Sequence, residues 1–238
     1  MNIFFDLDGT LTDPAEGITR GLEYAVTGLG SECPPREELE RFIGPPLKES
    51  LRRLLPGSDE QELLRAVGLY RERFTSAGMY ENRVFDDIPP LLTELTTRGD
   101  PLWVVTSKPR EYAGRILEHF DLHRCFVDIY GPQLSDHAIT KGELIGQLLS
   151  DHALEPDRCV MIGDRHYDAA GAAEQGIHFI GVLWGFGSYA ELADAGAGHI
   201  ASSPVEVGAI VREVERITPG TGIRGVRPAA SESLLQPE

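Results

Sequence analysis

Apolar residues along most of the chain form short runs separated by helical stripes. Ile3-Phe4-Phe5 is an apolar run of the kind that forms a buried strand. Further runs predict strands at Leu102–Val105, Phe126–Tyr130, Arg158–Ile162 and His178–Leu183, with a weaker one at His199–Ile200. Helical patterns lie between them, near residues 88–98, 109–120, 140–152, 167–175 and 204–217. Strands that alternate with helices predict an α/β fold with a doubly wound, Rossmann-like parallel sheet.

Residues from about 14 to 80 interrupt this alternation with helical stripes and no strand pattern, within an inserted block of residues 14–85. Ile18, Leu22, Val26 and Leu29 fall on one helical face, and a longer helix is expected at roughly residues 59–77. Because one strand precedes this block and the others follow it, we expect a small helical domain inserted into a core of residues 1–13 and 86–217. From residue 218 the Gly-, Pro- and Ser-rich sequence loses periodicity, and a disordered tail is expected there.

Composition narrows the class of protein. With 41% hydrophobic and 25% charged residues, the 238-residue chain has an ordinary globular composition. Its net charge of -16 argues against general affinity for nucleic acid or an anionic membrane. An N-terminal leader and an apolar stretch of the ~18 residues that span a bilayer are both missing, so we expect a cytoplasmic protein. An anionic substrate would need a concentrated cationic site.

Polar residues follow three of the predicted strands. Asp6 and Asp8 follow the first strand, Thr106-Ser107-Lys108 follows Leu102–Val105, and Asp164 and Asp168 follow Arg158–Ile162. Taken singly, Asp-x-Asp is consistent with a polar turn, and the other two with helix caps. The carboxyl ends of parallel strands form one edge of the sheet, where ligands bind. Three polar strand ends at that edge are harder to explain as turns and caps than any one of them alone. Paired acids there can hold a divalent cation while one attacks and the other moves a proton.

These residues together resemble the haloacid dehalogenase-like hydrolase superfamily. The four motifs are Asp6-Leu7-Asp8-Gly9-Thr10, an apolar strand that ends in Thr106, Lys141, and Gly163-Asp164 followed by Asp168. They occur in order, and the resemblance covers roughly residues 1–215. Taken alone, Lys141 near a helix start is also consistent with a solvated surface residue.

The resemblance implies a role for each site residue. Asp6 would be the nucleophile that forms an aspartyl-phosphate, and Asp8 would protonate the leaving oxygen and then activate water. The Thr106 hydroxyl and the Ser107 amide would bind phosphoryl oxygens, and Lys141 would neutralise the phosphate. Mg²⁺ would be held by Asp6, the Asp8 carbonyl and Asp164, with Asp168 supporting it indirectly.

The second acid and the position of the inserted block narrow the subclass. Members of this superfamily that cleave halides or phosphonates lack an acid at the position of Asp8, so Asp8 indicates phosphate esters. The long interval between Asp6 and Thr106 implies a helical cap after the first motif, with hinge strands at residues 12–14 and 80–86. Within this subclass the chain resembles phosphoglycolate phosphatase-type and 5'-nucleotidase-like enzymes, through Ile43-Gly44-Pro45-Pro46-Leu47, Thr106-Ser107-Lys108-Pro109 and residues 181–188.

The resulting hypothesis is a magnesium-dependent phosphatase for a small phosphorylated metabolite, either phosphoglycolate or a nucleoside monophosphate. Gly44, Pro45 and Lys108 are candidates for contacts that set substrate specificity. The alternative for Gly44 and Pro45 is that they only form a helix-to-helix turn, and for Lys108 that it only solvates a turn. The alternatives are a phosphosugar mutase of the β-phosphoglucomutase type and a non-catalytic phosphate-binding module. We expect a monomer or homodimer with no nucleic-acid or membrane partner.

Overall fold

A six-stranded parallel sheet forms the centre of the computed structural model, which describes residues 1–134 and 139–217. The strand order is β5-β4-β1-β6-β7-β8. The strands are β1 (Asn2–Phe5), β4 (Leu102–Val105), β5 (Asp128–Tyr130), β6 (Cys159–Gly163), β7 (His178–Val182) and β8 (His199–Ala201). The doubly wound parallel sheet predicted from the sequence is therefore confirmed. The tail expected from residue 218 lies outside the described residues.

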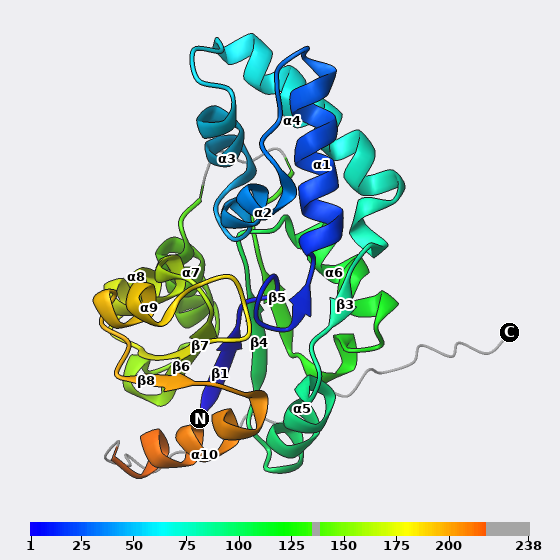
Figure 1. Cartoon of the computed structure of the whole chain (residues 1–238). Coiled ribbons are helices and arrows are strands. Elements are labelled where there is room, and N and C mark those ends of the chain that lie inside the picture. The colour runs from blue at the N-terminus through cyan, green and yellow to red at the C-terminus, as the bar shows by residue number, and fades with distance from the viewer. Residues whose placement is uncertain (135–138, 218–238) are drawn as a thin grey trace, which may run out of the picture.

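Helices cover both faces of the sheet (Figure 1). Alternate residues of a strand point to opposite faces, so Ile3 and Phe5 pack on one side and Phe4 on the other. The first face is covered by α5 (Ile88–Thr97), α6 (Arg110–His119) and α10 (Pro204–Ile217). The second face is covered by α7 (Lys141–Asp151) and α8 (His166–Gln175).

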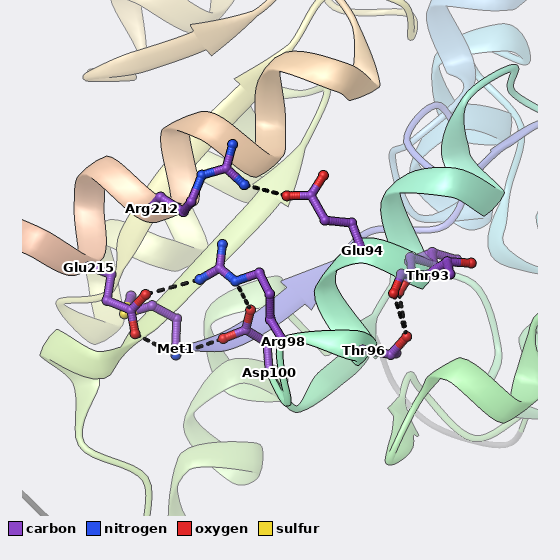
Figure 2. A network of polar contacts seen from close by, with 9 residues as sticks. Met1, Thr93, Glu94, Thr96, Arg98, Asp100, Arg212 and Glu215 are labelled. Carbon is purple, nitrogen blue, oxygen red and sulfur yellow. Dashed lines mark hydrogen bonds and ion pairs between the residues drawn. The ribbon is translucent and has the colours of Figure 1, made fainter.

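Ion pairs fix α10 against the start of the sheet, as Figure 2 shows. Arg98, just after α5, contacts Asp100 at 3.1 Å and Glu215 of α10 at 3.0 Å. The Met1 ammonium lies 3.1 Å from the same Asp100 carboxylate, and Arg212 pairs with Glu94. This network joins α5, α10 and the first strand at the end of the sheet away from the carboxyl ends of the strands (Figure 1).

Four helices follow β1 and gather beyond the carboxyl ends of the strands (Figure 1). They are α1 (Ala15–Gly28), α2 (Arg36–Leu39), α3 (Leu47–Leu54) and α4 (Glu60–Ser76). Both chain connections to this group run through a small antiparallel sheet of β2 (Thr12–Asp13) and β3 (Arg83–Val84). Gly17 of α1 lies so close to the carbonyl of Gly78 that an added Cβ would be 1.9 Å from that oxygen. Small residues therefore let α1 approach the end of the insertion closely.

The predicted strands and helices are present, with end shifts of one or two residues. β5 begins at Asp128 rather than Phe126, and β7 ends at Val182 rather than Leu183. The sequence analysis missed α9 (Tyr189–Asp194), because a six-residue helix with one buried leucine carries no apolar stripe. No helix in the described ranges is both long and apolar enough to cross a membrane.

Candidate active site

The three central strands bring the polar motifs to one edge of the sheet. β1 lies between β4 and β6, so Asp6, Thr106 and Asp164 follow neighbouring strands. Gly9, with a φ of 84°, lets the chain turn after the first motif. A Cβ on Gly9 would lie 2.2 Å from a carboxylate oxygen of Asp164, so this position also needs glycine for space.

Lys141 links the first and last motifs at the bottom of this edge. Its buried ammonium lies 3.0 Å from Asp6 Oδ1 and 2.9 Å from Asp168 Oδ1, and it donates to the Val105 carbonyl at 3.0 Å. Thr140 and Glu143 form a capping box that starts α7 at Lys141. Although burial opposes it, Asp168 and Asp6 raise the pKa of Lys141, so it stays protonated. The position is thus internal and paired.

Three buried carboxylates cluster around this ammonium. Oxygens of Asp6, Asp164 and Asp168 all lie within 4.8 Å of one another. Asp164 accepts a hydrogen bond from the Phe186 N–H at 2.8 Å and one from the Thr10 hydroxyl at 3.5 Å. Burial, reinforced by Asp168 and Asp6, raises the pKa of Asp164 well above its usual value. Burial also raises the pKa of Asp168 to about 6 although Lys141 opposes this.

This donor set fits a hard divalent cation. It consists of carboxylate oxygens only, the ligand type that Mg²⁺ takes in proteins. The cluster holds three carboxylates against the single ammonium of Lys141, and burial, with the neighbouring carboxylates adding to its effect, raises the pKa values of Asp164 and Asp168. A bound cation would relieve the excess of negative charge.

The second acid of the first motif has a different partner. Asp8 Oδ2 lies 2.7 Å from Lys108 Nζ, whereas the buried Asp8 Oδ1 has no hydrogen-bond partner among the described residues. Burial outweighs Lys108 and raises the pKa of Asp8. The Lys108 ammonium also lies over the ring of Phe74 from α4, 4.6 Å from its centroid. Lys108 thus contacts both Asp8 at the sheet edge and Phe74 of the inserted helices.

A cavity of about 790 Å³ lies between the sheet edge and the inserted helices. Its floor includes Asp6, Asp8 and Thr106 with the adjoining Ser107 and Lys108. The inserted helices supply Gly44 and Pro45 together with an apolar and aromatic group: Ile18, Leu22, Phe42, Leu64, Val67, Tyr70 and Phe74. Tyr70 and Phe74 stack with their rings 5.5 Å apart. Lys141 and Asp168 lie behind Asp6, in contact with each other and not on the cavity wall.

Several residues of this region were missed by the sequence analysis. Tyr70 and Phe74 lie on a helical stripe that is indistinguishable from ordinary core packing. Thr10 and the Phe186 amide, which hold Asp164, come from two different loops. The Gly185-Phe186-Gly187 sequence was an available signal, because it follows β7 at the same sheet edge and an added Cβ on Gly185 would lie 2.5 Å from Asp164 Oδ2.

Comparisons with known proteins find similar sequences and a similar fold. The sequence profile described as haloacid dehalogenase-like hydrolase matches residues 3–182. A protein from Pseudomonas aeruginosa named 5'-nucleotidase is 50% identical over 191 residues, covering 80% of this chain and 86% of that protein. Tyrosine-protein kinase PtkA from Mycobacterium tuberculosis is 38% identical over 185 residues, covering 78% of this chain and 62% of PtkA. The crystal structure of a predicted phosphatase from Clostridium acetobutylicum superposes with a TM-score of 0.85 at 40% identity, covering 89% of this chain and 98% of that one.

Proposed function

This chain belongs to the haloacid dehalogenase-like hydrolase family and is a phosphatase by class, and we propose that it is a magnesium-dependent nucleoside monophosphatase. The proposed reaction rests on one observation: two buried carboxylates, Asp6 and Asp8, lie at the floor of one cavity, and each contacts an ammonium group of its own. The observation that carries the substrate class is the apolar and aromatic wall of that cavity.

Asp6 is proposed as the nucleophile. Its Oδ1 accepts a hydrogen bond from the Leu7 N–H at 2.8 Å and contacts Lys141 at 3.0 Å, which fixes the carboxylate in one orientation. An Asp6 oxygen attacks phosphorus, the ester P–O bond breaks, and the phosphoryl group is held on Asp6 as an acyl phosphate. Thr106 and Ser107, on the adjoining cavity wall, are proposed to donate hydrogen bonds to the phosphoryl oxygens.

Asp8 is proposed as the general acid and base. The alcohol leaving group needs a proton, and a buried carboxyl with a raised pKa holds one more readily than an exposed one. In the second half-reaction Asp8 takes a proton from the water that attacks the acyl phosphate, which returns both residues to their starting state. Its Oδ1, which accepts no hydrogen bond from the described residues, is proposed to face the substrate oxygen.

Asp6, Asp164, the Asp8 carbonyl and, indirectly, Asp168 are proposed to hold the magnesium ion. When bound, the ion stabilises negative charge on the transferring phosphoryl group. Residues outside the ligand set prepare this site: the Phe186 N–H orients Asp164, while the Arg165 N–H donates to Asp168 Oδ2 at 3.1 Å. Such supporting hydrogen bonds commonly decide how well metal ligands are placed.

The cavity favours a nucleoside monophosphate over phosphoglycolate. A volume of about 790 Å³ lies within the range that encloses drug-sized ligands, whereas phosphoglycolate is much smaller. Phosphoglycolate also carries a carboxylate that requires a cation, and the cationic side chains of the described lining are engaged. Lys108 contacts Asp8, Lys48 and Arg52 pair with Glu60, and Arg71 donates to the Leu134 carbonyl. The Tyr70 and Phe74 rings offer a flat base an aromatic surface.

The inserted helices are proposed to act as a cap over this cavity. Their only covalent links to the core within the described residues run through the short strands β2 and β3, which pair through two residues each. Movement about this pair would admit substrate and release product, and closure would shield the acyl phosphate. Residues 14–85 would form the cap, and residues 1–13 and 86–217 the catalytic core.

The acceptor of the phosphoryl group separates this proposal from its alternatives. Water as acceptor gives a phosphatase, a second hydroxyl of a phosphosugar gives a mutase, and no transfer gives a binding module. The PtkA relative is named as a tyrosine kinase, so a tyrosine hydroxyl is a further acceptor to measure. Net release of phosphate distinguishes hydrolysis from the other three.

The test is phosphate release from nucleoside monophosphates, phosphoglycolate, a hexose phosphate and acetyl phosphate, with magnesium and with excess chelator. We expect magnesium-dependent release with the highest kcat/KM on nucleoside monophosphates. Asp6→Asn should abolish it, whereas Asp121→Asn, on an exposed turn after α6 and outside the cavity lining, should not. Preference for phosphoglycolate would contradict the proposed substrate class, and full activity of Asp6→Asn would contradict the nucleophile.

A further inference from the structure

One buried arginine connects the metal-site loop to the inserted helices. Arg165 directly follows Asp164, and its backbone N–H donates to Asp168 Oδ2. Its side chain leaves this loop and donates from Nη1 to the carbonyl of Ile43 at 2.5 Å. Arg165 is not part of the cavity wall, and its guanidinium meets backbone of the insertion rather than a site for substrate.

The segment that Arg165 contacts, called loop 43–47, joins the short helix Glu40–Phe42 to α3 and includes the first residue of α3. Gly44 in this loop has a φ of 105°, which favours glycine, and an added Cβ would lie 3.1 Å from Arg165 Cγ. The loop therefore lies directly on the Arg165 side chain. Gly44 and Pro45 also line the cavity, so Arg165 contacts the loop that forms this part of the cavity wall.

The core holds the guanidinium in place without help from the insertion. Glu191 of α9 accepts from Arg165 Nε at 2.9 Å, and its same oxygen accepts from the His166 N–H at 3.1 Å. His166 Nδ1 lies 2.6 Å from that oxygen as well. Glu191 is thus fixed by two residues of the α8 N-terminus, and it leaves Arg165 Nη1 directed at the Ile43 carbonyl. Donor and acceptor belong to parts of the chain whose covalent links, in the described ranges, run through β2 and β3.

We propose that Arg165 is a positioning residue that docks loop 43–47 on the catalytic core and thereby sets the KM for substrates long enough to reach that loop. This inference rests on the proposed phosphatase activity for its kinetic part only. A charged donor in a buried hydrogen bond is worth a factor of about ten or more in the docking equilibrium. A substrate that consists of little more than a phosphoryl group does not extend from Asp6 to Gly44, so its turnover does not depend on the docked loop.

The first experiment is amide hydrogen exchange on the full chain without metal or substrate, for wild type, Arg165→Gln and Arg98→Gln. Arg98 is a matched control, because its guanidinium also joins two segments of the chain, through Asp100 and Glu215, but lies at the opposite end of the sheet. We expect exchange in residues 43–51 to rise about tenfold in Arg165→Gln and to stay unchanged in Arg98→Gln. Unchanged exchange in that segment in Arg165→Gln would overturn the proposal. Arg165→Lys, which keeps the charge but lacks the fork that reaches both partners, replaces Arg165→Gln if the latter does not fold.

The second experiment compares steady-state kinetics on a nucleoside monophosphate and on acetyl phosphate. Arg165→Gln should raise KM for the nucleotide about tenfold, while kcat for both compounds and KM for acetyl phosphate stay near wild type. An equal loss of kcat on both would overturn the proposal, since it would place the effect at Asp164 and Asp168. Absence of phosphate release by the wild type would refute the proposed function alone, because hydrogen exchange reports the docking independently.

Discussion

Replacement of Lys141 by methionine tests whether one buried ammonium holds the site together. Methionine keeps much of the unbranched stem and removes the charge. The side chain is 3% exposed and has three oxygen partners at 2.9–3.0 Å: Asp6, Asp168 and the Val105 carbonyl. Loss of one partner of a buried ion pair costs about 3–5 kcal/mol, because an uncompensated charge stays buried. For a chain of this size each kcal/mol lowers Tm by about 2–4 °C, so a decrease of roughly 6–20 °C follows.

The loss of stability caused by Lys141→Met should depend on pH. The pKa of Asp168 is already raised to about 6 in the folded protein by burial, with Lys141 opposing the rise. A carboxyl group whose pKa is raised on folding destabilises the folded protein as the pH rises from the group's unfolded pKa, near 4, through its folded pKa. Removal of Lys141 raises the pKa of Asp168 further and enlarges this destabilisation. Destabilisation by Lys141→Met should therefore be greatest above about pH 6.5 and shrink toward about pH 5, where Asp168 takes up a proton.

Urea unfolding of the chelator-treated protein at about pH 7.5 and about pH 5 measures both effects. Lys48→Met is the matched control, because Lys48 also contacts a carboxylate but is 42% exposed and pairs with the exposed Glu60. We expect it to unfold like wild type. If Lys141→Met also unfolds like wild type, the buried ion pairs do not stabilise the fold. An equal loss at both pH values would assign the effect to packing of the lysine stem.

Three further predictions concern the metal and the acid. Magnesium should raise Tm of the wild type more at about pH 7.5 than at about pH 5, because protons compete for Asp164 and Asp168, whose pKa values are raised by burial; equal shifts would contradict metal binding at this cluster. Gly185→Ala should weaken magnesium binding about tenfold in calorimetric titration, since the methyl group would lie 2.3 Å from the Gly9 carbonyl oxygen and 2.5 Å from Asp164 Cβ. The control Gly198→Ala should bind magnesium like wild type, because an added Cβ there has no described atom within 4 Å. Asp8→Asn should lower kcat/KM, which reports formation of the acyl phosphate, by about 10²–10⁴-fold on a nucleoside monophosphate and much less on an aryl phosphate, whose leaving group needs no proton; equal losses of kcat/KM would argue against a general acid.

The centre of the sheet was predictable because its strands are short and mostly apolar. β4 and β6 are buried along their whole length and β1 from Ile3 to Phe5, so each contains a continuous apolar run, and a polar residue directly follows the strand. The adjacency of these strands places Asp6, Thr106 and Asp164 at one edge, which sequence order and topology alone imply. The predicted cluster therefore needed no knowledge of side-chain contacts.

Contacts between segments far apart in sequence were not predictable. The hydrogen bond from Arg165 to Ile43 joins residues 122 positions apart, and its acceptor is a backbone carbonyl that carries no sequence signal. The stacking of Tyr70 on Phe74 next to Lys108 depends on how α4 lies over the sheet edge. Periodicity predicts that α4 is a helix with an apolar face, but it does not say whether that face lies on a core or lines a cavity.

The central claim is that Asp6 carries the phosphoryl group during turnover. Acid quenching of the enzyme during turnover of a nucleoside monophosphate, followed by peptide mass spectrometry, tests it directly. The account predicts a phosphoryl group on the peptide that contains Asp6, labile in base and missing from Asp6→Asn. Continued phosphate release with no phosphorylated peptide, or with the phosphoryl group on another residue, would contradict it.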